Sequence, residues 1–447
     1  MDNHSPESDA SSVATAMRAA NRREDYGGRR GFEYTHWIKE QMSWKESCYL
    51  GDWSFLANLR LEGEGADELL STLSVNSFEE FSIGQAKHLI QCSSDGNVVA
   101  EGVLVRTDTD GFVVHGLPCY WTAFNLETGQ YGEFDVETEW RDTFNFQVQG
   151  PRSIELLEDL TGARLRDIEF IHSDTVTIDG VEVTAVRMGM AGELGFELQG
   201  PAADADRVWD AIVDAGEEYG LRRLSERTSS INHLEACFPT RGRDYVPAIF
   251  SEEMDPFRAW ADEHAARDIL TYPIEGSFDA DDISAWYRSP VELGWERNVA
   301  LDHDFVGSDA LASELEDPER TIVTLVWEDD DVIDTYASLF SEGPHNKYMD
   351  MPHQQKRAMI ADTVLGDGDA VGVSTCRGYS YYFREMLSLC TIDVEWSDPG
   401  TEVTVLWGEG DEPSSPTTES HEPKEIRATV APAPYKTDNR RADPRSV

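Results

Sequence analysis

Apolar and polar residues alternate along several stretches of the chain, and this two-residue period is typical of strands with one buried face. Alternation over residues 98–105 and 111–115 predicts a pair of strands joined by a turn. Residues 175–178 and 181–186 predict a β-hairpin, because the Asp179-Gly180 dipeptide between them suits a type I′ turn. These patterns place a sheet in the first half of the chain.

Apolar residues recur at helical spacing over residues 66–73, 152–160 and 204–219, and Gly220 follows the last of these segments as a stop signal. Helices and strands therefore alternate, but without the regular strand–helix–strand rhythm of a doubly wound sheet. The pattern predicts an α+β fold.

The chain becomes strand-rich after a predicted linker around residues 315–318. The expected strands cover residues 321–327, 370–374, 387–394, 402–407 and 426–430. Short strands with few helices predict a terminal β-barrel or sandwich. Residues 408–425 are rich in Glu, Ser, Pro and Thr, and we expect a mobile surface loop there.

The charge balance is strongly acidic, with 86 Asp and Glu against 37 Lys and Arg and a net charge of −49 over 447 residues. Such a surface repels phosphate backbones and anionic lipids, so we expect neither nucleic acid nor a membrane as partner. An apolar content of 40% is ample for a packed core. The acids are spread along the chain and only seven of the basic residues are lysine, which favours adaptation to concentrated salt over an ordinary acidic protein.

Residues 1–25 are polar, and we expect them to be disordered. They contain no apolar leader, and no stretch of the sequence approaches the length of a membrane span, so we expect a cytoplasmic protein. The six cysteines are far apart and lack metal-ligand spacing, which predicts free thiols and no metal site.

Motifs for phosphate loops, dinucleotides, serine hydrolases, zinc proteases and EF-hands are all missing from the sequence. Four segments in chain order nevertheless resemble the glycine-cleavage T protein (aminomethyltransferase) family. They are Phe146-Gln-Val-Gln-Gly-Pro151, Gly192-Glu-Leu-Gly-Phe-Glu197, Leu234-Glu-Ala236, and Leu293-Gly-Trp295 with Asp304-Phe-Val-Gly-Ser-Asp-Ala-Leu311.

A closer resemblance, from about Trp37 to Tyr435, is to the tetrahydrofolate-dependent vanillate/3-O-methylgallate O-demethylases. Matching C-terminal stretches include Tyr336-Ala-Ser-Leu-Phe340, Thr404-Val-Leu-Trp-Gly-Glu409 and Pro432-Ala-Pro-Tyr435. The resemblance implies a three-lobed folate-binding fold, with two lobes over residues 26–316 and a C-terminal β-barrel over residues 317–447. It also implies transfer of a methyl group from an oxygen to N5 of tetrahydrofolate, without a metal.

The resemblance further implies which residues bind the cofactor. Glu197 matches the glutamate that binds the pterin, and Gln147 matches a second pterin contact. Arg227 matches an arginine near the folate, with a surface arginine as the alternative. Phe238 stands where the demethylases have a tryptophan, so it stacks on the cofactor or fills the core.

On the substrate side the chain departs from its relatives. Glu101 replaces a catalytic aspartate of the glycine-cleavage proteins, and Ser229 replaces the expected tyrosine proton donor. The remaining expected substrate contacts are Trp53, Phe55, His115 and Trp121. The polar groups that would hold a benzoate are missing from this set, so the methyl donor need not be vanillate.

Three functions remain open from the sequence. The leading hypothesis is an O-demethylase that acts on a methyl ether with tetrahydrofolate as acceptor. The second is a glycine-cleavage aminomethyltransferase, or a demethylase of a sulfonium or methylamine compound. The third is a folate-binding protein without methyl transfer, which the altered proton-donor set would favour.

Overall fold

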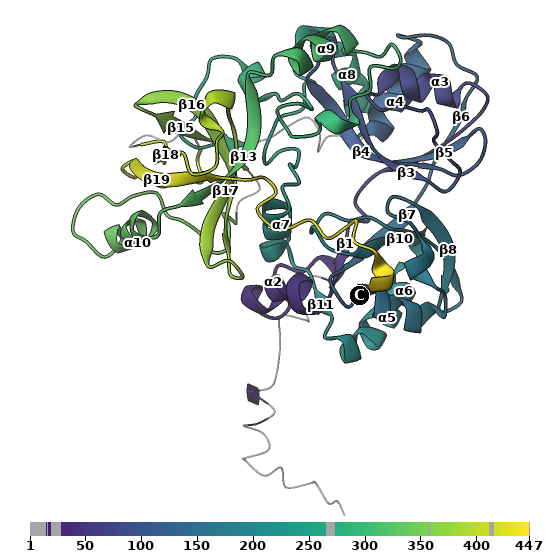
Figure 1. The fold of residues 1–447 in the computed structure, drawn as a ribbon, viewed down its shortest axis with the longest axis horizontal. Coiled ribbons are helices and arrows are strands. Elements are labelled where there is room, and N and C mark those ends of the chain that lie inside the picture. Colours follow the sequence, from purple (N-terminus) through teal and green to yellow (C-terminus); the bar gives the residue numbers. More distant parts are fainter. Residues whose placement is uncertain are drawn as a thin grey trace, which may run out of the picture.

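The computed structural model describes residues 15, 17–18, 28–264, 273–355, 358–410 and 415–446. These residues form three lobes, with helix α7 (Glu226–Glu235) between them and helix α2 (Trp37–Glu46) packed against α7 at the lower edge of the view (Figure 1). Apart from residues 15, 17 and 18, the segment predicted to be disordered, residues 1–25, lies outside the described residues.

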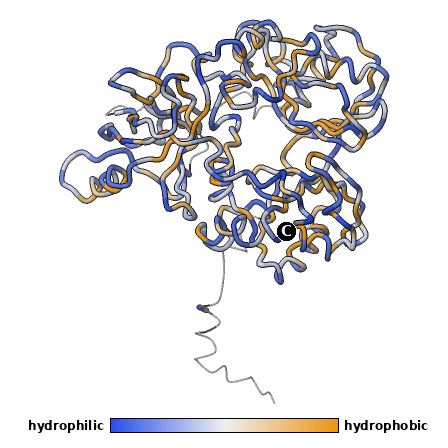
Figure 2. The backbone as a smooth tube through the Cα atoms, viewed as in Figure 1, coloured by the Kyte–Doolittle hydropathy of each residue, from blue (hydrophilic) through white to orange (hydrophobic). Residues whose placement is uncertain are grey.

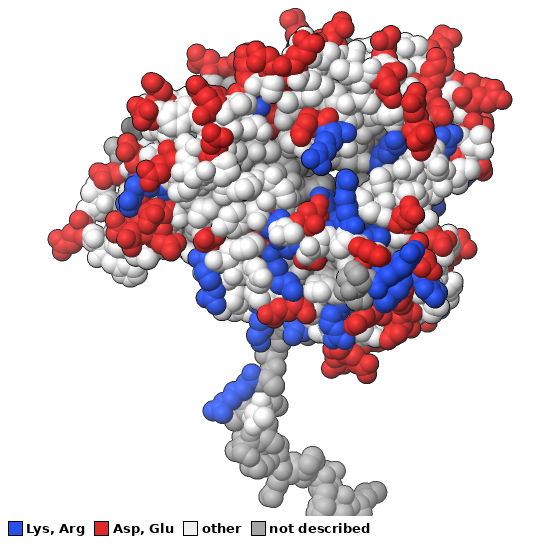
Figure 3. Space-filling view, in the orientation of Figure 1, with Lys and Arg blue, Asp and Glu red and all other residues white. Residues whose placement is uncertain are grey.

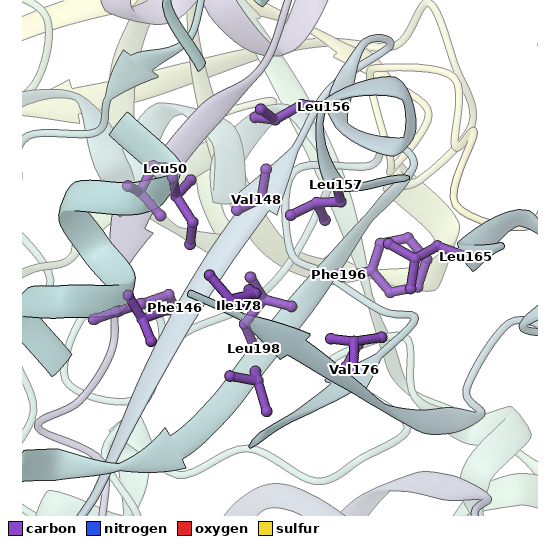
Figure 4. Close-up of a cluster of buried hydrophobic side chains, with 14 of the residues drawn as sticks. Leu50, Phe146, Val148, Leu156, Leu157, Leu165, Val176, Ile178, Phe196 and Leu198 are labelled. Atoms are coloured by element: carbon purple, nitrogen blue, oxygen red, sulfur yellow. The ribbon is translucent and has the colours of Figure 1, made fainter. Parts of the chain in front are cut away.

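The first lobe is a six-stranded sheet in the order β11-β1-β7-β10-β9-β8. Helices α5 and α6 pack on one face of it, over a core that includes Leu50, Phe146, Val148 and Leu198 (Figure 4). The elements are β1 (Tyr49–Asp52), β7 (Thr143–Gln149), α5 (Ser153–Thr161), β8 (Ser173–Ile178), β9 (Val181–Val186), β10 (Gly195–Pro201), α6 (Ala205–Gly216) and β11 (Arg222–Arg223).

The second lobe is a five-stranded sheet in the order β3-β4-β5-β2-β6, and most of it is inserted in the chain between β1 and β7 of the first lobe. Its elements are β2 (Asn58–Glu62), α3 (Ala66–Leu73), β3 (Ala86–Cys92), β4 (Val98–Arg106), β5 (Gly111–Gly116), α4 (Pro118–Thr128) and β6 (Glu137–Trp140), joined by α8 (Asp255–Glu263) and α9 (Ser308–Glu316). The two sheets meet where Ala86 and Val105 pack against Val186.

The third lobe is a closed barrel in the order β13-β17-β16-β15-β18-β19. Its elements are β13 (Arg320–Trp327), α10 (Asp329–Ser338), β15 (Asp362–Gly366), β16 (Asp369–Ser380), β17 (Glu385–Asp393), β18 (Glu402–Trp407) and β19 (Lys424–Ala431). A short pair, β12 (Ile274–Glu275) and β14 (Met359–Ile360), lies outside it. In Figure 2, hydrophobic segments gather inside the lobes and hydrophilic ones follow the outer loops.

Buried charged groups join α2 and α7 to the barrel. Glu235 on α7 accepts hydrogen bonds from Trp44 Nε1 on α2 at 2.9 Å and from Ser380 Oγ on the barrel at 2.5 Å. Lys45 Nζ lies 2.7 Å from the same carboxylate, and both side chains are almost fully buried. The C-terminal segment then runs from the barrel back to the first lobe, where Lys436 Nζ donates to the carbonyl of Gly192 (Figure 1).

The predicted α+β fold with a C-terminal barrel is confirmed. The helix predicted over residues 66–73 is α3, and the predicted hairpin is β8 and β9, with positive φ at both Asp179 and Gly180 as a type I′ turn requires. Strand β15 and helix α10 were not predicted, since neither shows a clear apolar period. The predicted mobile loop joins β18 to β19, and within its described part His421 is buried. No helix in the described part of the chain is long and apolar enough to cross a bilayer.

Replacing Glu235 by Gln is expected to lower the free energy of unfolding by about 3–5 kcal/mol, because Lys45 then keeps a buried charge without its partner. The matched control is Glu155→Gln, whose carboxylate pairs with Arg152 at the surface and contributes less than about 1 kcal/mol. Urea unfolding at one fixed salt concentration measures both. Equal effects for the two variants would contradict the role of Glu235 in joining the lobes.

Candidate functional site

One face of the first sheet is buried yet polar. In β7, Phe144, Phe146 and Val148 enter the hydrophobic core, and because side chains alternate across a strand, the residues between them point to the opposite face. Those residues are Asn145, Gln147 and Gln149, and β10 adds Glu197 and Gln199 to the same face. All five are at most 9% exposed. Buried polar groups need hydrogen-bond partners, so packing alone does not account for the residues on this face.

The polar side chains on this face form a continuous hydrogen-bonded row. Gln147 Nε2 donates to Glu197 Oε1 at 2.8 Å, and Tyr49 Oη donates to Gln147 Oε1 at 3.0 Å. Asn232 on α7 donates to Tyr49 Oη at 3.4 Å, and Asn145 donates to Glu197 Oε2 at 3.4 Å. Glu197 and Gln147 stand opposite each other because they are directly paired in the β7–β10 ladder.

Burial raises the pKa of the Glu197 carboxyl above its ordinary value, while the hydrogen bonds from Gln147 and Asn145 lower it in part. Burial also raises the pKa of Tyr49 well above its ordinary value, and the Glu197 carboxylate raises it further. Tyr49 therefore stays a hydrogen-bond donor, and a further hydrogen bond donated to Glu197 would favour its ionised form.

Three buried atoms on or beside the row have no hydrogen-bond partner in the part of the chain that the structure describes. They are Asn145 Oδ1, Asn232 Oδ1 and Gln199 Nε2. The row can thus accept hydrogen bonds at Asn145, Asn232 and Glu197 and donate one at Gln199. A flat ligand with both donors and acceptors at its edge matches this set.

Glycines allow the 187–194 loop to approach the row closely. A Cβ on Gly189 would lie 1.6 Å from Gln149 Nε2, and Gly192 has φ +65°. Gln149 in turn accepts a hydrogen bond from the backbone N–H of Ala191 at 3.1 Å. The motif Gly189-Met-Ala-Gly192 therefore has a backbone role beside the site.

A second group of side chains lies on the sheet of the second lobe. Glu101 Oε2 lies 3.1 Å from His88 Nε2, and both side chains are about one-fifth exposed. The His88 ring contacts Trp295 edge-on at 4.8 Å and the Phe238 ring at 5.9 Å. Phe238 also contacts the buried His233 ring. The structure thus brings Glu101 and Phe238 together through His88, which the sequence analysis did not single out.

The structure separates several other predicted site residues from these two groups. Arg227 Nη1 forms an ion pair with Glu33 at 3.0 Å, and its Nη2 donates to the carbonyl of Met351. Ser229 Oγ is half-buried and donates to the carbonyl of Glu226. Both residues are therefore engaged away from the row of Glu197.

The four predicted substrate contacts fall in different surroundings. Trp53 is buried in one cluster with Tyr49 and so adjoins the row, whereas Phe55 is 56% exposed and lies under Arg30. Trp121 is 1% exposed and packs on Phe257 in the second lobe.

His115 is buried beside Asn58, whose Nδ2 lies 3.3 Å from His115 Nδ1. Burial lowers the pKa of His115 to about 4, so the ring is neutral at pH 7. Its Nε2 is buried without a partner among the described residues.

Charge is distributed unevenly around the lobes. Figure 3 shows acidic side chains over the outer rim and basic side chains gathered around the hollow between the lobes on this face. A ligand that carries a carboxylate is therefore drawn toward the centre even though the whole chain carries −49.

The functional residues missed from sequence are Tyr49, Asn145, Asn232 and His88. Alternation along residues 143–149 could have indicated Asn145, because it shares a face with Gln147. Nothing in the sequence connects Asn232 to Tyr49, since 183 residues separate them.

Comparisons with known proteins show the family of the chain. The model of the GCVT N-terminal domain matches residues 12–259, more than half of the chain. Syringate O-demethylase from Sphingobium sp. is 35% identical over 416 residues, which cover 90% of this chain and 89% of that protein. Sesamin methylene transferase from Sinomonas sp. is 35% identical over 420 residues, with the same coverage.

The fold is also that of a solved relative. The crystal structure of glycine cleavage system aminomethyltransferase T from Bartonella henselae covers 92% of this chain with a TM-score of 0.65 at 17% identity. The chain belongs to the GCVT family, and its relatives make it a one-carbon-transfer enzyme. The resemblance stated from the sequence is confirmed.

His115→Gln tests the buried neutral histidine. Because the folded pKa of about 4 lies below the unfolded value of about 6.5, protonation favours the unfolded chain and stability falls as the pH drops through this window. Between pH 7 and pH 4.5 the wild type is expected to lose about 2–3 kcal/mol more than the variant. Denaturant unfolding at constant ionic strength measures the difference, and equal losses would show that His115 titrates normally.

Proposed function

We propose that this protein transfers an oxygen-linked one-carbon group from a small aromatic ether to tetrahydrofolate. The observation that carries the proposal is the buried polar row of Glu197, Gln147, Tyr49 and Asn232, with the unpartnered atoms of Asn145 and Gln199 beside it. A pterin ring is flat and offers an amino-pyrimidine edge with donors and an acceptor. The residues present therefore fit the cofactor.

Glu197 is the anchor of this cofactor site. A carboxylate accepts two parallel hydrogen bonds from an amino-pyrimidine edge, and such charge-assisted bonds are about twice as strong as neutral ones. Gln147 and Asn145 hold the Glu197 carboxylate in one orientation. Tetrahydrofolate, when bound, supplies the nucleophilic N5 that accepts the one-carbon group.

Glu101 and His88 act at the reacting end in this proposal. Their contact of 3.1 Å lets Glu101 orient the imidazole, and Trp295 and Phe238 fix the ring from two sides. As the carbon–oxygen bond breaks, negative charge grows on the departing oxygen, and a proton must reach it. His88 can donate that proton to the departing oxygen and take up the proton that N5 loses. Ser229 is too weak an acid for this role, and its hydroxyl donates to the carbonyl of Glu226.

The names of the two relatives point to two kinds of one-carbon donor. An O-demethylase takes a methyl group and a methylene transferase takes a methylene group, and the chain is equally similar to one of each. With a methyl ether the products are a phenol and 5-methyltetrahydrofolate. With a methylenedioxy donor the carbon bridges N5 and N10, and two hydroxyl groups are left. The methyl ether is our first choice.

We also propose the partners of the enzyme and the compartment in which it works. We propose a small-molecule donor rather than a lipoylated carrier, nucleic acid or membrane, and a cytoplasm rich in salt, where the charge of −49 is screened. A glycine-cleavage aminomethyltransferase would need the carrier, and a non-catalytic folate-binding protein would bind tetrahydrofolate without turnover.

Glu197→Ala is expected to weaken tetrahydrofolate binding about 10- to 100-fold, the loss typical of a hydrogen bond to a charged group. Binding should also weaken as the pH falls toward the raised pKa of Glu197, and this dependence should vanish in Glu197→Gln. Calorimetry in molar potassium chloride measures both effects. Glu402→Ala, an exposed glutamate on the barrel, is the control, and unchanged affinity in Glu197→Ala would refute the cofactor site.

Glu101→Gln is expected to lower kcat about 10- to 100-fold while the affinity for tetrahydrofolate stays the same, because the loss falls on orientation and proton transfer. His88→Gln should lower kcat similarly, and the double variant should lose little more. Single-turnover formation of the product measures this. Additive losses would show that the two side chains act separately.

A screen of methoxylated and methylenedioxy aromatics, sulfonium compounds and methylated amines identifies the donor. Mass spectrometry separates 5-methyl- from 5,10-methylenetetrahydrofolate in molar potassium chloride. We expect turnover with free aromatic ethers. Turnover that occurs only with a lipoylated carrier would favour the aminomethyltransferase, and tight folate binding without any product would favour the non-catalytic protein.

A further inference from the structure

A cavity of about 30 Å³ lies between α7 and the barrel. Among the residues that line it are Ser230 from α7, Arg243, His353, and Arg377 and Trp407 from the barrel. By the usual measure this volume holds roughly two water molecules, so it has room for a halide ion or a single carboxylate group.

Two arginines line the cavity without an acidic partner. Arg243 donates to Ser230 Oγ, and Arg377 Nη2 donates to Gln354 Oε1 at 3.1 Å and to the carbonyl of Asp350 at 3.0 Å. No Asp or Glu carboxylate of the described residues lies within 4 Å of either guanidinium. In a chain with 86 acidic residues, two such arginines around one cavity are unusual.

Buried atoms of the lining also lack partners among the described residues. Arg377 is 7% exposed, and its Nε has no hydrogen-bond acceptor. His353 is 6% exposed, and its Nδ1 lies 2.8 Å from the carbonyl of Gln354, which leaves Nε2 unpartnered. A buried charged group without a counter-charge is costly, so a bound anion would stabilise this arrangement.

Three carboxylates act electrostatically on these arginines, and each is held by other groups. Asp350, whose Oδ2 accepts from the backbone N–H of Gln355 at 3.2 Å, and Asp362 act on Arg377, and Asp244 acts on Arg243. Asp244 accepts from the backbone N–H of Thr240 at 2.7 Å and from Thr375 Oγ1 at 2.8 Å. Asp362 accepts from the N–H of Ser277. Burial raises the pKa of each of these two carboxyls to about 6. These carboxylates act on the two guanidinium groups only at longer range, and none of them lines the cavity.

We propose that this cavity binds one small monovalent anion, a free halide or a terminal carboxylate, between Arg243 and Arg377. The bound anion ties the barrel to α7. The proposal is independent of the reaction assigned above, because residues two apart on a helix differ by about 200° in direction. Ser230 therefore faces the cavity while Asn232 faces the row of Glu197.

Chloride itself is the probe for the test. Line broadening of the ³⁵Cl resonance should saturate with protein present, and the saturable part should fall at least fivefold in Arg377→Met and in Arg243→Met. Arg427→Met is the matched control, because Arg427 pairs with Asp331 on the barrel surface. Circular dichroism checks that each variant is folded. A variant that is folded yet broadens chloride as the wild type does would overturn the proposal.

Wild-type crystals grown in potassium bromide give a test that needs no variant. We expect an anomalous peak between the two guanidinium groups, and the absence of that peak at molar bromide would overturn the proposal. Displacement of bound chloride distinguishes the two candidate occupants, a free anion and a terminal carboxylate. Displacement by tetrahydrofolate but not by tetrahydropteroate, which lacks the glutamyl carboxylates, assigns the site to that carboxylate, and displacement by neither assigns it to a free anion.

Discussion

The alternation of side chains across β7 and β10 is the constraint on which the rest of this structure depends. One face of these strands carries Phe146, Val148 and Leu198 into the core of the first lobe. The same two-residue period obliges Gln147 and Glu197 to point the other way. The apolar face holds the sheet together, and its rigidity fixes the hydrogen bonds on the polar face. The hydrophobic core and the polar row therefore lie on opposite faces of the same β7–β10 pair. A shift of its register by one residue would disrupt both.

The site also needs the lobes to stay in place, and buried ionic groups at the centre achieve this. Glu235 receives hydrogen bonds from α2 and from the barrel and pairs with Lys45. Because breaking a buried ion pair leaves an uncompensated charge, these contacts favour one arrangement of α2, α7 and the barrel. Asn232, one turn earlier on α7, is thereby held against Tyr49. The same helix thus connects the contacts around Glu235 to the polar row of Glu197.

Charge is divided between the outside and the inside of the molecule. Acidic side chains cover the outer rim, and basic ones surround the central hollow (Figure 3). Few acids are buried, and those that are, such as Glu197, Glu235 and Asp244, all accept hydrogen bonds. The net charge of −49 therefore belongs mainly to the solvent-facing surface, and only a few carboxylates are buried.

Local patterns in the sequence determined much of the fold. The hairpin at Asp179-Gly180, helix α3 and most barrel strands follow from periods and turn residues that lie next to one another in the chain. The resemblance to the family also singled out Glu197 and Gln147 as candidate cofactor ligands, and the structure pairs the two residues in the β7–β10 ladder. Tertiary structure alone decided that Tyr49 and Asn232 complete their row, that His88 joins Glu101 to Phe238, and that Arg227 turns to Glu33. These contacts join residues far apart in the chain through ladder register and helix packing, and no local period records them.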